Sequence, residues 1–238
     1  MTLPEISYLE LIISCLPVIV AAIIFYRWKA NSKELIFATL RMIAQLIAVG
    51  FVLVYLFKST SCLLGSLVIL LMLIIAGWIA MRPLADKSFK HIVLLSQSLL
   101  LGCGSILVLI VVYVLDLSPW YQPRFVIPLA GMLLANTMNS LSLSGERLQT
   151  EIKAGAVLDY ARNKAFYAAM IPQINSLLAV GLVALPGMMT GQILSGVSPL
   201  VAVRYQIVIM VAILCSSVFS TAWYLSRRTK LLNVAIKP

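Results

Sequence analysis

Seven long apolar runs divide this chain of 238 residues and leave little room for any other kind of structure. A run of about 18 apolar residues is long enough to cross the hydrocarbon core of a bilayer as a helix. Backbone groups in lipid must satisfy their own hydrogen bonds, and the runs lack the alternation of membrane-barrel strands, so we expect helices. The runs cover residues 7–26, 36–57, 62–81, 92–115, 126–145, 168–187 and 203–225. The sequence therefore predicts an all-α fold, a polytopic transmembrane helical bundle of about seven spans, forming a single domain over 1–238.

The distribution of charge predicts the topology. The chain is 62% hydrophobic and 11% charged, against roughly 25% charged in a soluble domain. Its net charge of +10 is concentrated in every second loop and in the tail. These basic clusters are Arg27, Lys29 and Lys33; Arg82, Lys87 and Lys90; Arg147, Lys153, Arg162 and Lys164; and Arg227, Arg228, Lys230 and Lys237, whereas the alternate loops carry only Lys58 and Arg124, with Arg204 at a span edge. By the positive-inside rule the N-terminus lies outside and the C-terminus in the cytosol. We expect a multi-pass protein of the cell membrane whose basic residues contact lipid and not nucleic acid.

One long polar segment, ERLQTEIKAGAVLDYARNKAF at 146–166, separates two of the apolar runs. Apolar and charged residues alternate in it at helical spacing, and Gly155 is expected to break the helix. The pattern predicts two short helices joined near Gly155 and Ala156 on the cytosolic side. The segment is either a solvated hairpin lying on lipid or a coupling element that seats in the groove of a partner protein.

Two polar residues interrupt the second run. Arg41 lies about one and a half turns from its cytosolic end, and Gln45 follows four residues later on the same helical face. The pair is either a snorkelling arginine with a packing amide or part of a translocation pathway.

The fifth and sixth runs carry amides and hydroxyls that are costly to expose to lipid. Asn136 and Ser140 share one face of the fifth run, Asn139 lies beside them, and Asn175 lies near the start of the sixth. These side chains either form hydrogen bonds between helices or line a translocation path, and we expect the three asparagines in the bundle interior. Gly131 and Ala135 form a small-xxx-small pair that favours close helix approach.

A helix break follows the sixth run. Pro186 and Gly187 end the helix near the outer face, and 187–199 is predicted to form a short cap or re-entrant turn. Met188, Met189 and Gln192 come directly after the break and are candidates for the outer end of the path. Thioethers suit soft metal ions, but flexible packing explains the methionines equally well. No metal ligands are assigned.

Several enzyme classes are excluded by the motifs that the sequence lacks. No GxxxxGK[ST] string is present, so the chain cannot hold ATP in a P-loop, and no cofactor is expected in it. His91 is the only histidine, which removes HExxH zinc chemistry, and it is expected to be an ordinary interfacial residue. The four cysteines are dispersed and are expected to be free thiols. We therefore expect a transport protein that draws energy from a gradient or a partner.

Two strings carry a resemblance to a known family. They are IPLAGMLLANTMNSLSL at 127–143 and IPQINSLLAVGLVALPGMMTGQILSGVSPLVAVRYQIVIM at 171–210. Together with Arg41 and Gln45-Leu46 in the second run and Pro119-Trp120-Tyr121 before the fifth, they resemble the FetB-type iron-export permease family, which has plant relatives tied to aluminium tolerance.

The resemblance implies a permease subunit of an ABC transporter. It further implies a homodimer of permeases, a separate ATPase chain that binds the ATP, and the export of iron or resistance to metal. On this interpretation the polar segment docks the ATPase through Glu151, Gly155, Ala156, Asp159 and Arg162. The alternatives are a gradient-driven secondary transporter, an ABC exporter of an organic solute, and a structural or adaptor protein.

Overall fold

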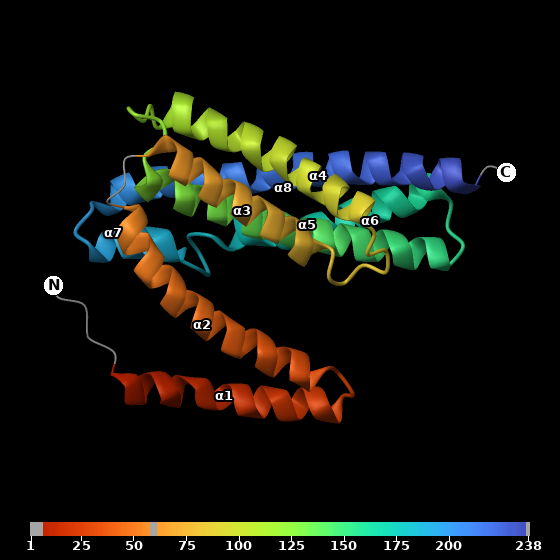
Figure 1. The fold of residues 1–238 in the computed structure, drawn as a ribbon, viewed down its shortest axis with the longest axis horizontal. Coiled ribbons are helices and arrows are strands. Elements are labelled where there is room, and N and C mark those ends of the chain that lie inside the picture. Colours follow the sequence, from red (N-terminus) through yellow and green to blue (C-terminus); the bar gives the residue numbers. More distant parts are fainter. Residues whose placement is uncertain (1–6, 58–60, 237–238) are drawn as a thin grey trace. The chain divides into compact units, whose positions relative to one another are not determined.

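The computed structural model describes residues 7–57 and 61–236, and the prediction of an all-α fold is confirmed over these residues, which contain helices and no β-strand. Lys58 and Lys237, which belong to the charge pattern, lie outside them. The helices are α1 (Tyr8–Arg27), α2 (Ser32–Leu56), α3 (Cys62–Ala80), α4 (Phe89–Val108) with the π-helical extension η1 (Leu109–Val114), α5 (Pro123–Lys153), α6 (Leu158–Ala179), α7 (Gly187–Leu194) and α8 (Pro199–Ile236) (Figure 1).

Six helices of the described chain are long and apolar enough to span a membrane, namely α1, α2, α3, α4 with η1, α5 and α8. The seventh predicted span is different. The run 168–187 does not form one continuous helix, because α6 ends at Ala179 and α7 begins only at Gly187. Gly181 between them has a φ of 83°, a left-handed conformation that ends a helix and that glycine adopts without strain. The prediction of about seven spans is thus close, and the N-out, C-in orientation stays a prediction.

The chain separates into two compact units, Met1–Ser59 and Thr60–Pro238. In the first, α1 and α2 form a helical hairpin that turns through Lys29, whose φ is 57°. No residue of α1 is buried, and Leu56 is the only buried residue of α2. Helices that expose apolar side chains all round are suited to lipid contact. The prediction of one domain over 1–238 stays a prediction.

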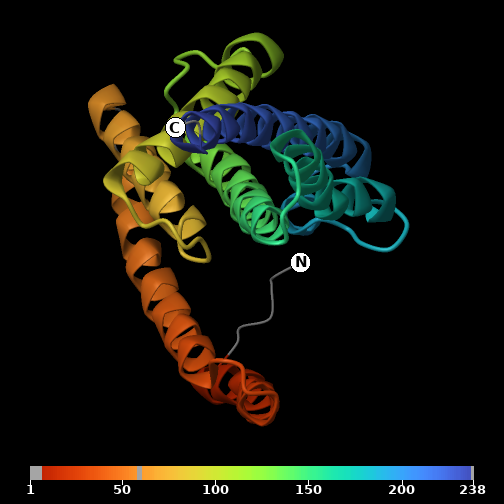
Figure 2. The same ribbon diagram turned by 90° about the vertical axis from the view of Figure 1, so that its right-hand side faces the viewer.

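The second unit is a bundle in which α8 packs along α4, α5 and α6, while α3 packs against α4 and α5 (Figures 1 and 2). Its core includes the fully buried Leu95, Leu99, Leu133 and Leu141. One end of the bundle, called the turn end, carries the α3–α4 loop, the α5–α6 turn and the C-terminal part of α8 (Figure 1). The opposite end, called the α7 end, carries α7 and the first turns of α5 and α8 (Figure 1).

Two glycines determine how closely the helices of this bundle approach. A Cβ on Gly102 of α4 would lie 2.8 Å from the Ser220 amide nitrogen and 2.9 Å from the Ser216 carbonyl oxygen of α8. A Cβ on Gly145 of α5 would lie 2.7 Å from a methyl carbon of Leu84. The predicted small-residue contact at Gly131 is looser, because a Cβ there meets only the mobile end of Met72, at 3.2 Å.

The two longest helices exceed the thickness of a bilayer. α5 has 31 residues and α8 has 38. At 1.5 Å per residue they are roughly 46 and 57 Å long, against about 30 Å for the hydrocarbon core. Apart from Arg124, the charged residues of α5 lie in its last third, so we expect the turn end to project beyond the lipid.

Candidate functional site

The α5–α6 turn is an exposed feature of the turn end. α5 ends at Lys153, α6 begins at Leu158, and Gly155 between them has a φ of 85°. The break at Gly155 is confirmed. The prediction of two short helices is wrong, because the polar segment forms the last turns of one long helix and the first turns of another, stabilised by the bundle below them.

The predicted coupling residues are spread over this turn. Glu151 forms an ion pair with Arg147 on α5, and Asp159 pairs with Arg162 on α6 at 3.1 Å. Ion pairs one helical turn apart on a surface contribute only about 0.3–0.5 kcal/mol, so a docking partner can exchange them at little cost. Ala156 is partly buried and packs against the hydrophobic core. Val157 next to it is 76% exposed, so it and not Ala156 presents an apolar contact at the tip.

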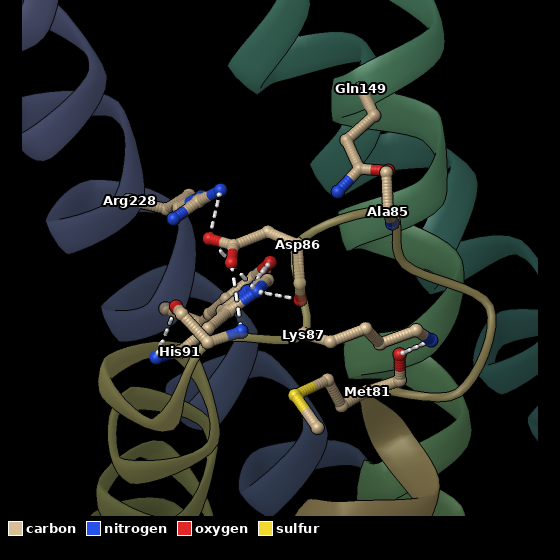
Figure 3. Close-up of polar contacts among 9 residues, drawn as sticks. Met81, Ala85, Asp86, Lys87, His91, Gln149 and Arg228 are labelled. Atoms are coloured by element: carbon tan, nitrogen blue, oxygen red, sulfur yellow. Dashed lines mark hydrogen bonds and ion pairs between the residues drawn. The ribbon is translucent and has the colours of Figure 1, made fainter.

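The α3–α4 loop is held to the bundle by a polar network (Figure 3). Lys87 donates to the carbonyl oxygens of Met81, at 2.8 Å, and Arg82, and so caps the C-terminus of α3. The Ala85 amide donates to Gln149 Oε1 of α5 at 3.1 Å. The Asp86 carboxylate lies 2.9 Å from the Arg228 guanidinium of α8.

Asp86 is ionised at neutral pH. Partial burial alone would raise its pKa, but the amide of Ser88 donates a hydrogen bond to the carboxylate at 2.9 Å and the positive charge of Arg228 faces it. The hydrogen bond and the ion pair outweigh burial and lower the pKa of Asp86 from 3.8 to about 2. The carboxylate therefore holds the loop to α8 throughout the physiological pH range.

His91 is the buried centre of the network and is 1% exposed. Its Nδ1 lies 2.9 Å from the Asp86 carbonyl oxygen, which only accepts hydrogen bonds, so Nδ1 carries the proton. Its Nε2 then accepts a hydrogen bond from the Tyr224 hydroxyl of α8, at 2.9 Å, while the two rings stack with centroids 5.8 Å apart. The sequence-based expectation of an ordinary interfacial histidine missed this contact across 133 residues.

Two grooves open on the turn end beside α8. One, of about 220 Å³, lies between the α3–α4 loop, α5 and α8, with Asp86, Leu148 and Arg228 in its wall. The other, of about 360 Å³, lies between α6 and α8 and is lined by Arg162, Tyr167 and Ser226 among others. Both grooves border the turn, since Lys153 at the end of α5 lines the first and Arg162 in the first turns of α6 lines the second.

The bundle interior contains hydroxyl groups from several helices. Thr137 of α5 donates to Ser216 of α8 at 3.2 Å and lies 3.4 Å from the Ser217 hydroxyl. Gln173 of α6 donates to Ser140 of α5 at 3.1 Å. All of these residues are at most 7% exposed, so they join α5 to α6 and α8 inside the bundle.

The three predicted pathway asparagines do not meet in the interior. Asn136 is partly buried and donates to the Met132 carbonyl of its own helix at 2.9 Å. Asn139 and Asn175 are exposed, so the expectation of an interior position is wrong for these two. They lie on the helical faces turned away from the core, while Thr137 and Gln173 occupy the inward faces. Their role in translocation stays a prediction.

Arg41 and Gln45 face each other on α2, as their spacing predicts. With the amide oxygen turned toward the guanidinium, Gln45 accepts from Arg41 Nε at 3.2 Å and from Nη2 at 3.3 Å. This pair belongs to the first unit, and its place on a translocation path stays a prediction.

The residues after Pro186 form the short helix α7, and its two methionines lie in different places. Met188 and Gln192, four residues apart on one face, line a cavity of about 310 Å³ with the first turns of α5 and α8. Met189 lines a separate cavity of about 310 Å³ between the end of α6 and α8. The contact of either sulfur atom with a metal stays a prediction, and the described residues contain no group of three histidine, cysteine or acidic side chains placed to hold a metal ion.

Sequence reasoning missed the network around Asp86 and the cavity residues Arg124 and Tyr205. The available signals for the first were the single histidine and the pair Tyr224 and Arg228, which lie one turn apart where the last apolar run gives way to the basic tail. Arg124, one of few basic residues in the loops predicted to lie outside, was the signal for the second.

Comparison with known proteins identifies the family. The profile of the uncharacterised protein family UPF0014 matches residues 8–231. The chain is 37% identical to the UPF0014 membrane protein slr1647 of Synechocystis, over 84% of each chain. It is 33% identical to the "Probable iron export permease protein FetB" of Escherichia coli, over 92% of this chain and 90% of that one. The rice UPF0014 membrane protein STAR2 is 33% identical over 79% of this chain and 70% of its own length.

No solved structure matches the chain. The family match covers α1 to α7 and α8 as far as residue 231, and the resemblance to FetB-type permeases is confirmed. Together with six helices able to span a membrane, these matches identify a multi-pass membrane protein. The chain therefore belongs to the UPF0014 family.

Proposed function

We propose that this chain is the transmembrane subunit of an ABC transporter that exports metal, with iron as the first candidate. The observation that carries the proposal is the identity of 33% with the probable iron export permease FetB over 92% of the chain. A separate ATPase subunit supplies the energy and binds the ATP, and two copies of the permease assemble around the path.

The α5–α6 turn supports the choice of a partner-driven transporter. It combines an apolar tip at Val157, weakly held surface ion pairs and two flanking grooves, all at the end that we expect to project from the lipid. An exposed apolar tip of this kind suits insertion into a groove of a partner protein. The long helices α5 and α6 provide a rigid connection from that tip to the bundle interior.

The docking test compares two valine-to-glutamate changes. Val157→Glu places a charge at the exposed tip of the turn, and Val183→Glu makes the same change at a residue that is 85% exposed on the α6–α7 connection. We expect Val157→Glu to reduce copurification with the ATPase and stimulation of its turnover, and Val183→Glu to leave both unchanged. Ala156→Glu is less informative, because Ala156 packs against the core and a glutamate there also disturbs folding.

Export is tested in vesicles that contain the permease and its ATPase, with iron, other divalent metals and organic solutes as cargo. ATP-dependent accumulation of iron supports the proposal. Normal stimulation of the ATPase by Val157→Glu contradicts the docking site, and iron movement that follows an ion gradient without ATP contradicts the ABC mechanism.

A further inference from the structure

The cavity at the α7 end combines apolar walls with a small number of polar groups. It has a volume of about 310 Å³ and lies between the first turns of α5, α7 and the start of α8. Phe125, Leu129 and Val201 form apolar wall, while Arg124 and Gln192 are polar. A volume of about 300 Å³ or more with few polar groups is typical of sites for small organic ligands.

Arg124 gives this cavity a positive charge. It is the second residue of α5, and none of the ion pairs among the described residues includes it. No aspartate or glutamate lines the cavity within the described chain. A bare divalent cation would therefore meet a guanidinium and no carboxylate, whereas a carboxylate or phosphate would be attracted and can accept two hydrogen bonds from arginine.

Gln192 supplies a second, independent indication of a ligand. Its Oε1 is buried and has no hydrogen-bond partner. A buried amide oxygen without a donor is unfavourable, and an O–H or N–H group of a molecule in the cavity would satisfy it. Met188, one turn earlier on the same face of α7, adds a polarisable apolar contact beside it.

We propose that the cavity binds an organic anion, with an acidic group on Arg124, a hydrogen-bond donor on Gln192 and an apolar body against Phe125. Taken with the proposed function, on which this last step rests, the cargo is such an anion or its anionic complex with a metal, and not a bare metal cation. The binding itself does not depend on transport and is tested on the permease without its ATPase.

The probe is 2,3-dihydroxybenzoate, which carries a carboxylate, two O–H donors and an aromatic ring. Binding to the full chain in lipid nanodiscs is measured by calorimetry beside the neutral analogue 2,3-dihydroxybenzamide and ferrous ion alone. We expect the benzoate to bind and Arg124→Gln to weaken its binding at least about tenfold, as expected for the loss of a charged hydrogen bond. Arg204→Gln removes the same charge from an exposed residue of α8 that does not line the cavity, and it should leave affinity unchanged.

Further variants separate an anion site from a cation site. Gln192→Glu adds a negative charge to the wall, so it should weaken benzoate binding and would strengthen the binding of a cation. Arg124→Lys keeps the positive charge and should retain part of the affinity, and thermal unfolding of each unliganded variant shows whether it has folded.

Several outcomes would overturn the proposal. These are no binding of the benzoate, equal binding of benzoate and neutral amide, and equal loss in Arg124→Gln and Arg204→Gln. Nanodiscs with and without phosphatidylglycerol distinguish a soluble anion from a lipid headgroup. A response to Arg124→Gln with the lipid alone would assign the site to lipid and reject a soluble ligand.

Discussion

Replacing Tyr224 with phenylalanine tests the network that holds the α3–α4 loop to α8. The change removes only the hydroxyl that donates to His91 Nε2 at 2.9 Å and keeps the ring that stacks on the imidazole. His91 is 1% exposed, so its Nε2 loses its donor in a place that water does not reach. A buried polar atom left without a partner costs about 1–3 kcal/mol.

The assay is thermal unfolding of the purified protein. For a chain of this size, the midpoint temperature of unfolding shifts by about 2–4 °C for each kcal/mol of stability. Tyr113→Phe is the matched control, because Tyr113 is 79% exposed and the same hydroxyl is removed there without a buried partner. We expect Tyr224→Phe to unfold at a lower temperature than both the wild type and this control. Equal stability of the two variants would refute the reasoning that the hydroxyl is the partner of His91.

A second prediction concerns the contact between the same hydroxyl and Gly145 of α5. A Cβ on Gly145 would lie 2.9 Å from the Tyr224 oxygen, so Gly145→Ala introduces a clash that phenylalanine partly relieves. The double variant should therefore be more stable than the sum of the two single losses predicts, by about 0.5–3 kcal/mol, the usual size of coupling between contacting residues. Strict additivity would show that the hydroxyl does not occupy this position.

Three further changes probe other parts of the chain. Gly102→Ala should destabilise the bundle by about 1–3 kcal/mol, because the added methyl group meets the backbone of Ser220, which cannot move aside. Thermal unfolding measures the loss, and unchanged stability would contradict the close contact between α4 and α8. The pKa of Asp86 is lowered to about 2, so its ionised form contributes stability at pH values above its ordinary pKa of 3.8. That contribution is lost as the pH falls through about 2. Unfolding measured from pH 6 to pH 2 should accordingly show a smaller acid-induced loss in Asp86→Asn than in the wild type, and equal losses would exclude the ion pair. The double variant Met188→Leu, Met189→Leu keeps the side-chain volume and removes both sulfur atoms. Because the two residues line separate cavities, we expect wild-type metal resistance and expression. Loss of resistance at normal expression would indicate that the sulfur atoms contact the metal.

Much of the fold follows from local sequence. The apolar runs predict the spans because hydrophobicity and helix length are properties of one continuous stretch, and neither depends on what packs beside it. Gly155 predicts the turn between α5 and α6 for the same reason, since a left-handed conformation is a property of one residue. The spacing of Arg41 and Gln45 likewise predicts their contact within one helix.

The composition of the candidate sites depends on tertiary contacts that no local pattern encodes. His91 and Tyr224 meet across 133 residues, and Thr137 reaches Ser216 across 79, because α8 returns along α4 and α5. Asn139 looks as polar as Thr137 in the sequence, yet it lies on the exposed face, since only the packing of neighbouring helices decides which face of an apolar helix is inward. The amino-acid sequence by itself determined a helical, multi-pass membrane protein with one long polar segment that is broken at Gly155. Tertiary structure alone decided which polar side chains share a cavity, because burial and proximity arise only when separate helices pack.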